Sequence, residues 1–146
     1  MKDQSGINLN EMVDSIRCIR VSPDGSELAS GDEVGNIRIH SLKTPEFAQT
    51  RYLESHDSEV ISLAYSDAIP AQNVDGNRYM LASGGRDRQV LLYDSDMNYE
   101  VFMNLDHHSS TITSLAFNDA EGSGIELISS SADKSLVSKR FDNARF

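Results

Sequence analysis

The segment VISLAYS at residues 60–66 decides the fold, because similar segments stand at residues 16–22 (IRCIRVS) and 112–118 (ITSLAFN). Each copy is followed by a turn and then by two more apolar runs. The second runs are LASG at 28–31, LASG at 81–84 and LISS at 127–130, and the third runs are IRIH at 37–40, VLLY at 90–93 and LVSK at 136–139. Repetition on this scale predicts a solenoid, a propeller or a repeat array.

The spacing inside each copy is constant, although the spacing between copies is not. The first runs start at residues 16, 60 and 112, so they lie 44 and 52 residues apart. The distance from the start of the second run to the end of the third run is 12 residues in every copy. The extra length lies in a polar insertion at residues 68–77, where a loop tolerates it at small cost.

The runs have the length and composition of β-strands. They are short, rich in Val, Ile, Leu, Tyr and Phe, and bounded by turn residues such as Pro23-Asp24-Gly25. A fourth, more polar run follows the first two copies, at residues 50–53 and 100–103. Four antiparallel strands per unit predict a propeller blade, so we expect an all-β fold.

This organisation divides the chain into four parts. We expect a polar N-terminal segment at residues 1–14, blade 1 at 15–53, blade 2 at 54–106, and blade 3 at 107–146 without an outer strand. Three blades are fewer than the four to eight of a closed propeller, so they form an open arc with two apolar flanks. The expected partners include the remaining blades of the same or a longer chain. The alternative is a six-bladed ring made by two copies.

Composition limits the function classes. The net charge of −10 and the lack of a basic stripe argue against nucleic-acid or acidic-membrane partners. The single cysteine, Cys18, cannot form an internal disulfide, which favours a reducing, cytoplasmic compartment. Because Cys18 lies inside an apolar strand, we interpret it as a small residue that packs in the hydrophobic core and not as a reactive thiol. No apolar run is long enough for a signal peptide or a membrane span.

The second copy carries polar residues at characteristic places. Ser55-His56 precedes the first run, Ser83 lies on the second, Asp87 stands in the next turn, and Tyr93-Asp94 end the third run. These residues resemble the WD40 repeat, and the resemblance covers residues 14–140. It implies that His56, Ser83, Asp87 and Tyr93 form a buried hydrogen-bonded network that locks the blade.

The other copies depart from this pattern. The third keeps His108, Ser129 and Asp133 but has Lys139-Arg140 in place of the aromatic residue and Asp, so the resemblance implies a partial network. The first has Met12, Val34 and His40 at the corresponding positions. We therefore expect no such network in blade 1, and expect that blade to be held least rigidly.

Longer phrases narrow the resemblance. They are VSPDG at 21–25, LASGD at 28–32, GNIRIH at 35–40, HDSEV at 56–60, RDR at 86–88, HSSTIT at 108–113 and ADKS at 132–135. Together they resemble the mitogen-activated protein kinase-binding protein family. That resemblance implies a non-catalytic scaffold for stress-activated kinases or for spindle-pole and centrosomal proteins. The alternative is a substrate receptor or complex subunit of another WD40 family, for example in ubiquitin transfer.

Two groups of residues also permit a catalytic or metal-binding interpretation. Ser83, His56 and Asp87 are the residue types of a catalytic triad, but Ser83 lies inside a strand without a strained nucleophile turn, so we expect no enzyme. Asp106-His107-His108 could offer metal ligands, but zinc needs three or four at defined spacing. We expect no metal and no cofactor.

The loops at one end of the blades give a candidate partner surface. In a propeller these loops share one rim, and a mixed-charge rim can steer and orient a protein partner. The candidate rim residues are Asp32, Glu33, Asp57, Glu59, Arg86, Arg88 and Lys134. Ser22-Pro23 could be a proline-directed phosphorylation site, but the tight turn at Pro23-Asp24-Gly25 already explains this dipeptide.

Overall fold

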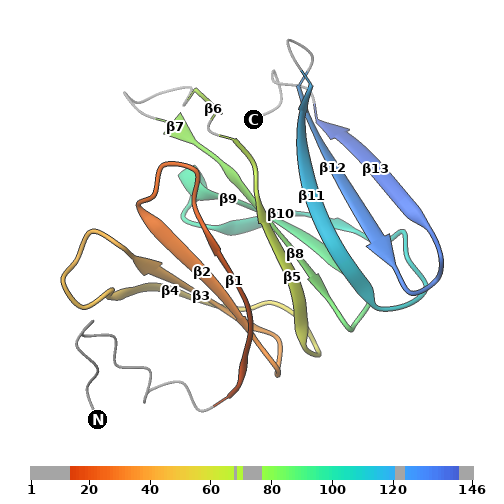
Figure 1. Ribbon diagram of the computed structural model, residues 1–146, viewed down its shortest axis with the longest axis horizontal. Coiled ribbons are helices and arrows are strands. Elements are labelled where there is room, and N and C mark those ends of the chain that lie inside the picture. The colour runs from red at the N-terminus through yellow and green to blue at the C-terminus, as the bar shows by residue number, and fades with distance from the viewer. Residues whose placement is uncertain (1–13, 68, 71–76, 121–123, 142–146) are drawn as a thin grey trace.

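The computed structural model describes residues 14–67, 69–70, 77–120 and 124–141, and it arranges their main strands in three antiparallel sheets (Figure 1). Blade 1 contains β1 (Ile16–Val21), β2 (Glu27–Asp32), β3 (Asn36–Ser41) and β4 (Gln49–Glu54). Blade 2 contains β5 (Val60–Tyr65), β8 (Met80–Gly85), β9 (Val90–Asp94) and β10 (Glu100–Leu105). Blade 3 contains β11 (Ile112–Ala120), β12 (Gly124–Ser131) and β13 (Leu136–Phe141).

The three sheets share one construction. Strands adjacent in the repeat pair antiparallel, in the orders β1-β2-β3-β4, β5-β8-β9-β10 and β11-β12-β13. Each inner strand has a register shift after its first residue, at Ile16, Val60 and Ile112. The repeated sequence therefore produces a repeated register, and any position in one blade has a defined counterpart in the others.

The inner strands β1, β5 and β11 lie side by side, and the sheets fan out behind them (Figure 1). This arrangement confirms the all-β fold and the open arc of three blades. The third sheet has three strands within the described residues. The ends of the insertion pair as a short ribbon of β6 (Ile69–Pro70) and β7 (Asn77–Arg78), and residues 71–76 lie outside the described part.

Two apolar cores hold the blades together. The first joins blade 1 to blade 2 and includes Ile37, Ile39, Val60, Leu63 and Leu81. The second joins blade 2 to blade 3 and includes Val90, Leu92, Ile112, Leu115 and Leu127. Each core consists of residues from two neighbouring sheets, so each blade is stabilised in part by the blade beside it.

Regular helix contributes little to this structure. Within the described residues the helical segment is a single 3-10 turn, η2 (Ser95–Met97), between β9 and β10. No helix in that part of the chain is long and apolar enough to cross a membrane.

The same backbone contact recurs at one end of every blade. The turn after the middle strand donates a hydrogen bond to the segment before the inner strand, as Glu33 N to Ser15 O (2.9 Å), Arg86 N to Glu59 O (2.9 Å) and Ala132 N to Thr111 O (3.0 Å). We call these turns and segments, residues 14–15, 33–35, 55–59, 86–89, 106–111 and 132–135, the turn rim.

Candidate functional site: blade networks and the turn rim

In blade 2 the structure brings the four network residues together. His56 Nδ1 lies 2.9 Å from Asp87 Oδ1, and His56 Nε2 lies 2.7 Å from Ser83 Oγ. Ser83 Oγ lies 3.1 Å from the Tyr93 hydroxyl. A carboxylate only accepts, so Nδ1 donates to Asp87; a neutral imidazole then accepts from Ser83 at Nε2, and Ser83 accepts from Tyr93. Each polar group in this chain of hydrogen bonds has a partner.

Asp87 also organises the turn in which it lies. Its carboxylate accepts from the backbone N–H of Asp57 at 3.0 Å and from that of Gln89 at 3.2 Å. The network therefore links the middle strand of blade 2 to two segments of the turn rim.

Blade 3 contains a related but altered network. His108 Nε2 lies 2.8 Å from Ser129 Oγ, while Nδ1 lies 3.0 Å from Ser135 Oγ and 3.3 Å from Asp133 Oδ2. The Ser135 hydroxyl and the Ser109 N–H hold the pKa of Asp133 below its ordinary value. Lys139, at the position of Tyr93, is exposed.

The burial of these groups bears on the catalytic interpretation. Ser83 is completely buried, and the His56 side chain is also inaccessible, so neither can meet a substrate in this structure. The structure places His108 in the blade 3 network, whereas Asp106 and His107 are exposed. The described residues contain no cluster of three or more metal-ligating side chains.

Blade 1 is held by a different polar pair, which the sequence analysis missed. Asp32 Oδ2 accepts from Arg38 NH1 at 2.7 Å, and Asp32 Oδ1 accepts from the N–H groups of Val34, Gly35 and Asn36 at 2.9–3.0 Å. The Arg38 guanidinium lies 4.9 Å from the centre of the Tyr52 ring, in cation–π contact.

The placement of Asp32 corrects the predicted rim. Asp32 is 1% exposed, so it contributes nothing to a surface that a partner could touch. Burial alone raises the pKa of Asp32, but hydrogen bonds from the Asn36 N–H and the Arg38 guanidinium outweigh burial and bring the pKa below its ordinary value. The carboxylate is therefore buried in its charged form, with the partners that a buried charge requires.

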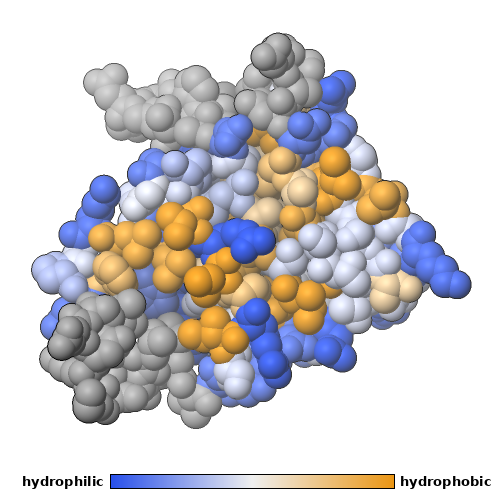
Figure 2. All heavy atoms as spheres, viewed as in Figure 1, coloured by the Kyte–Doolittle hydropathy of each residue, from blue (hydrophilic) through white to orange (hydrophobic). Residues whose placement is uncertain are grey.

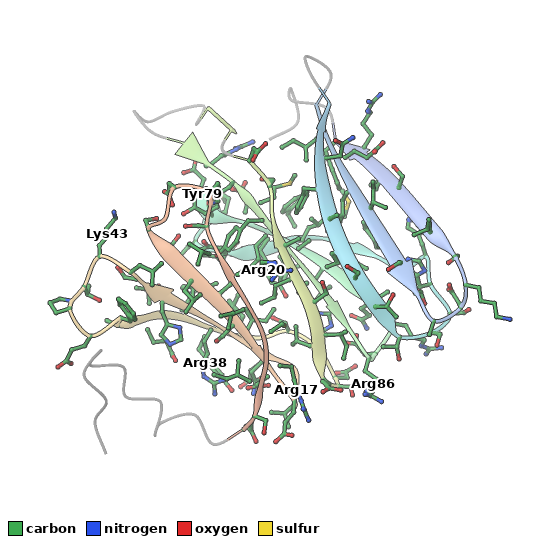
Figure 3. All side chains as sticks on the ribbon, viewed as in Figure 1. Arg17, Arg20, Arg38, Lys43, Tyr79 and Arg86 are labelled. Atoms are coloured by element: carbon green, nitrogen blue, oxygen red, sulfur yellow. The ribbon has the colours of Figure 1, made fainter. Side chains whose placement is uncertain are left out.

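The centre of the turn rim is an ion-pair cluster around Glu59. Arg17 Nε lies 2.6 Å from Glu59 Oε1, and Arg86 NH2 lies 2.8 Å from Glu59 Oε2. Arg17 also lies 3.4 Å from Glu33. The Arg17 and Arg86 side chains are 47% and 60% exposed, whereas that of Glu59 is 15% exposed. Figure 3 shows Arg17 and Arg86 next to each other at the ends of blades 1 and 2.

The remaining rim residues lie on the turns around this cluster. Glu33, Asp57, Arg88 and Lys134 are all exposed. Arg88 and Lys134 occupy equivalent turn positions and share the left-handed backbone conformation, each with φ of 73°. Blade 1 has Gly35 at that position, because a Cβ there would lie 2.1 Å from the carbonyl oxygen of His56. Blades 2 and 3 thus present a basic side chain where blade 1 makes a close backbone contact.

Two other predicted features lie away from the rim. Burial raises the pKa of the Cys18 thiol to about 11, and the side chain packs against the core between blades 1 and 2. Ser22 is 3% exposed; its hydroxyl donates to Asp24 at 2.7 Å and accepts from the Glu27 N–H at 3.0 Å. A kinase could not reach Ser22 without opening this turn.

A second missed group lies at the opposite end of the blades. Glu27 Oε1 accepts from the Tyr79 and Tyr99 hydroxyls, both at 2.8 Å, and the Tyr65 hydroxyl lies 3.2 Å from that of Tyr99. Burial raises the pKa of Tyr65 and Tyr99. This carboxylate–tyrosine group ties blade 1 to blade 2 from the end away from the turn rim.

The repeated blades, their register and the residues of the blade 2 network define a WD40 arrangement. The family profile described as "WD domain, G-beta repeat" matches residues 9–41, 47–94 and 100–137. The chain belongs to the WD40 repeat family.

Most of the chain is also similar in sequence to two curated proteins with different names. The chain is 37% identical over 134 residues to mitogen-activated protein kinase-binding protein 1 of Homo sapiens, covering 92% of this chain and 8% of that protein. It is 40% identical over 126 residues to WD repeat-containing protein 62 of Mus musculus, covering 86% and 8%. The chain therefore spans about a twelfth of the length of these curated relatives. The resemblance to the kinase-binding protein family is confirmed.

Solved structures show the same architecture. The structure of U3-55K aligns with a TM-score of 0.71 and 25% identity, covering 88% of this chain and 36% of the other. The WD40 repeats of RRP9 align with a TM-score of 0.70, the same identity and the same coverage.

Proposed function

We propose that this chain is a protein-interaction part of a WD40 scaffold and that the turn rim contacts the partner. The observation that carries the proposal is the clamp of Arg17 and Arg86 on Glu59. Glu59 fixes two exposed guanidinium groups from two blades, so little side-chain freedom is lost when a partner binds. A guanidinium binds carboxylates through two parallel hydrogen bonds, which favours a partner segment that contains Asp or Glu.

We propose further that the partner belongs to kinase signalling. Mitogen-activated protein kinase-binding protein 1 is named for binding such a kinase, and this chain is similar to a short part of it. The family resemblance also implies a cytoplasmic location with association at spindle poles or centrosomes. We place the interaction on the turn rim because its charged groups are exposed, whereas the histidines and serines of the networks below them are buried.

The test is a charge reversal at two exposed rim positions. The double variant Arg86→Glu, Arg88→Glu is expected to bind a purified stress-activated mitogen-activated protein kinase at least about fivefold more weakly, with the melting temperature unchanged. The control is Lys43→Glu, a single charge reversal on an exposed turn far from Arg86, and it is compared with the single variant Arg86→Glu, which makes the same charge change (Figure 3).

The outcomes are distinct. Equal weakening by Lys43→Glu would show a nonspecific charge effect and would remove the rim from the proposal. A parallel fall in binding and in melting temperature would assign the arginines a structural role. In cells, the double variant is expected to lose its spindle-pole or centrosomal signal when imaged as a fluorescent fusion.

A further inference from the structure

A hydroxyl-bearing residue precedes proline at two places in the sequence, Ser22-Pro23 and Thr44-Pro45. A kinase that recognises serine or threonine before proline could use either dipeptide, and the sequence alone does not choose between them. The structure allows a direct comparison. One dipeptide follows β1 and the other follows β3, so both lie at the end of blade 1 away from the turn rim (Figure 1).

The two turns share a backbone pattern. The Gly25 N–H donates to the Ser22 carbonyl oxygen at 2.9 Å, and the Phe47 N–H donates to the Thr44 carbonyl oxygen at 3.2 Å. The fourth residue of each turn has left-handed backbone, with φ of 75° at Gly25 and 49° at Phe47. Glycine adopts this conformation freely, whereas a bulky residue rarely does. The Thr44 turn is therefore the more strained of the two, and we expect it to open more easily.

Ser22 is bonded into the end of the β1–β2 pair. It is 3% exposed, and its N–H donates to the Glu27 carbonyl oxygen at 2.8 Å. Opening this turn would also disturb the Glu27 carboxylate, which accepts from the Tyr79 and Tyr99 hydroxyls of blade 2. A kinase would therefore have to loosen a contact between two blades in order to reach Ser22.

Thr44 lies on the surface of the molecule. It is partly exposed, and its neighbours Lys43, Pro45 and Glu46 are exposed. Figure 3 shows Lys43 projecting from this turn away from the sheets. Proline also biases the residue before it towards extended backbone, which is the conformation in which a kinase binds its substrate segment.

The hydrogen bonds of the Thr44 hydroxyl are local. It donates to the Ser41 carbonyl oxygen at 3.3 Å and accepts from the Ala48 N–H at 2.8 Å. Both partners belong to the same connection between β3 and β4. Breaking these bonds frees the hydroxyl without disturbing the contact between blades 1 and 2.

We propose that Thr44 is a phosphorylation site for a proline-directed protein kinase and that Ser22 is not. In the reaction a bond forms between Thr44 Oγ1 and the γ-phosphorus of ATP. The bond from that phosphorus to the β–γ bridging oxygen breaks, so that ADP leaves, and the hydroxyl proton passes to the catalytic carboxylate of the kinase.

The product is compatible with the fold. The Ala48 N–H can donate to the phosphate in place of the hydroxyl, and the exposed Lys43 is adjacent in sequence. Phosphorylation would therefore add negative charge to the end of blade 1 opposite the turn rim. Because the site lies away from the turn rim, the inference does not rest on the proposed function.

The test compares the folded chain with two synthetic peptides, residues 17–28 and 39–50. Each is incubated with ATP and a purified, active mitogen-activated protein kinase, and mass spectrometry follows the phosphate on Ser22 and on Thr44. The rate in the peptide divided by the rate in the folded chain gives the protection that the fold provides, corrected for the sequence preference of the kinase. Protection is expected to be at least about tenfold greater at Ser22 than at Thr44.

Two results would overturn the proposal. Equal protection of the two sites is what modification through global unfolding produces, and it would remove the distinction between the turns. No phosphate on Thr44 in the folded chain would exclude the site, whatever the rate in the peptide. The control is Thr44→Val, which keeps the shape of the side chain without its hydroxyl and should lose nearly all of the incorporated phosphate. Incorporation that persists in this variant, with its fold verified by circular dichroism, would place the acceptor elsewhere and would also overturn the proposal.

Discussion

The buried imidazole in blade 2 gives the sharpest test of what holds a blade together. Replacing His56 by Ala removes the hydrogen bonds to Asp87 and Ser83 and leaves a space in a fully buried site. The expected result is a lower free energy of unfolding, because both former partners remain in the protein interior.

The structure allows the size of this loss to be estimated. In the variant, Asp87 still accepts from two backbone N–H groups and Ser83 still contacts the Tyr93 hydroxyl, so each side chain retains at least one hydrogen-bond partner. The lost hydrogen bond to the carboxylate is worth about 1.5–3 kcal/mol, and the one to the hydroxyl about 0.5–1.5 kcal/mol. A loss of about 3 kcal/mol is therefore expected for His56→Ala.

Urea unfolding followed by circular dichroism measures this loss, and His107→Ala is the matched control. His107 is exposed beside the blade 3 network, so its replacement by Ala is the same chemical change at an unburied site. The expected loss in the free energy of unfolding is less than about 0.5 kcal/mol. His56→Ala and His107→Ala destabilising the chain equally would refute the idea that the network locks the blade.

Four further outcomes follow from the described contacts. Arg38→Met should lower the free energy of unfolding, measured in urea, by about 3 kcal/mol, because it leaves Asp32 as a buried charge without its cation. A loss below about 1 kcal/mol would contradict a structural role for this ion pair. Because the pKa of Asp32 is lowered on folding, its contribution is complete above the unfolded value of about 3.9 and is lost as pH falls through the folded value. Asp32→Asn should therefore show a smaller loss of stability between pH 6 and pH 3 than the wild type, and parallel curves would exclude this role. Glu27→Gln should lower the free energy of unfolding in the same urea assay by about 1–2 kcal/mol, because the Tyr79 and Tyr99 hydroxyls then donate to a neutral acceptor. With its pKa near 11, Cys18 should react with iodoacetamide at pH 7.5 roughly a hundredfold more slowly than a cysteine peptide, and equal rates would contradict its burial.

The repeat made the fold predictable from sequence. Three segments aligned at residues 16, 60 and 112 start at the first residues of β1, β5 and β11. The residue types at His56, Ser83, Asp87 and Tyr93 were enough to expect that they lie together. Their spacing corresponds to fixed places in the register, so local sequence carries tertiary information here.

The missed features depend on contacts that spacing does not encode. Asp32 and Glu33 are adjacent acidic residues in sequence, yet one is buried and the other exposed. The difference arises because Asp32 ends β2 on the face shared with Arg38, six residues later on β3. The available signal was Arg38 itself, a charged residue at the register position of the apolar Leu91 and Val137.

The turn rim reaches onto an inner strand through Arg17. The register shift after Ile16 leaves Arg17 as an extra residue in β1, and its guanidinium contacts Glu59 of the next blade. Figure 2 shows hydrophilic residues at this end of the blades, below the hydrophobic residues over β1 and β2. Arg17→Glu should therefore weaken binding of a rim partner, as expected for Arg86→Glu, and unchanged binding would show that blade 1 takes no part in the rim.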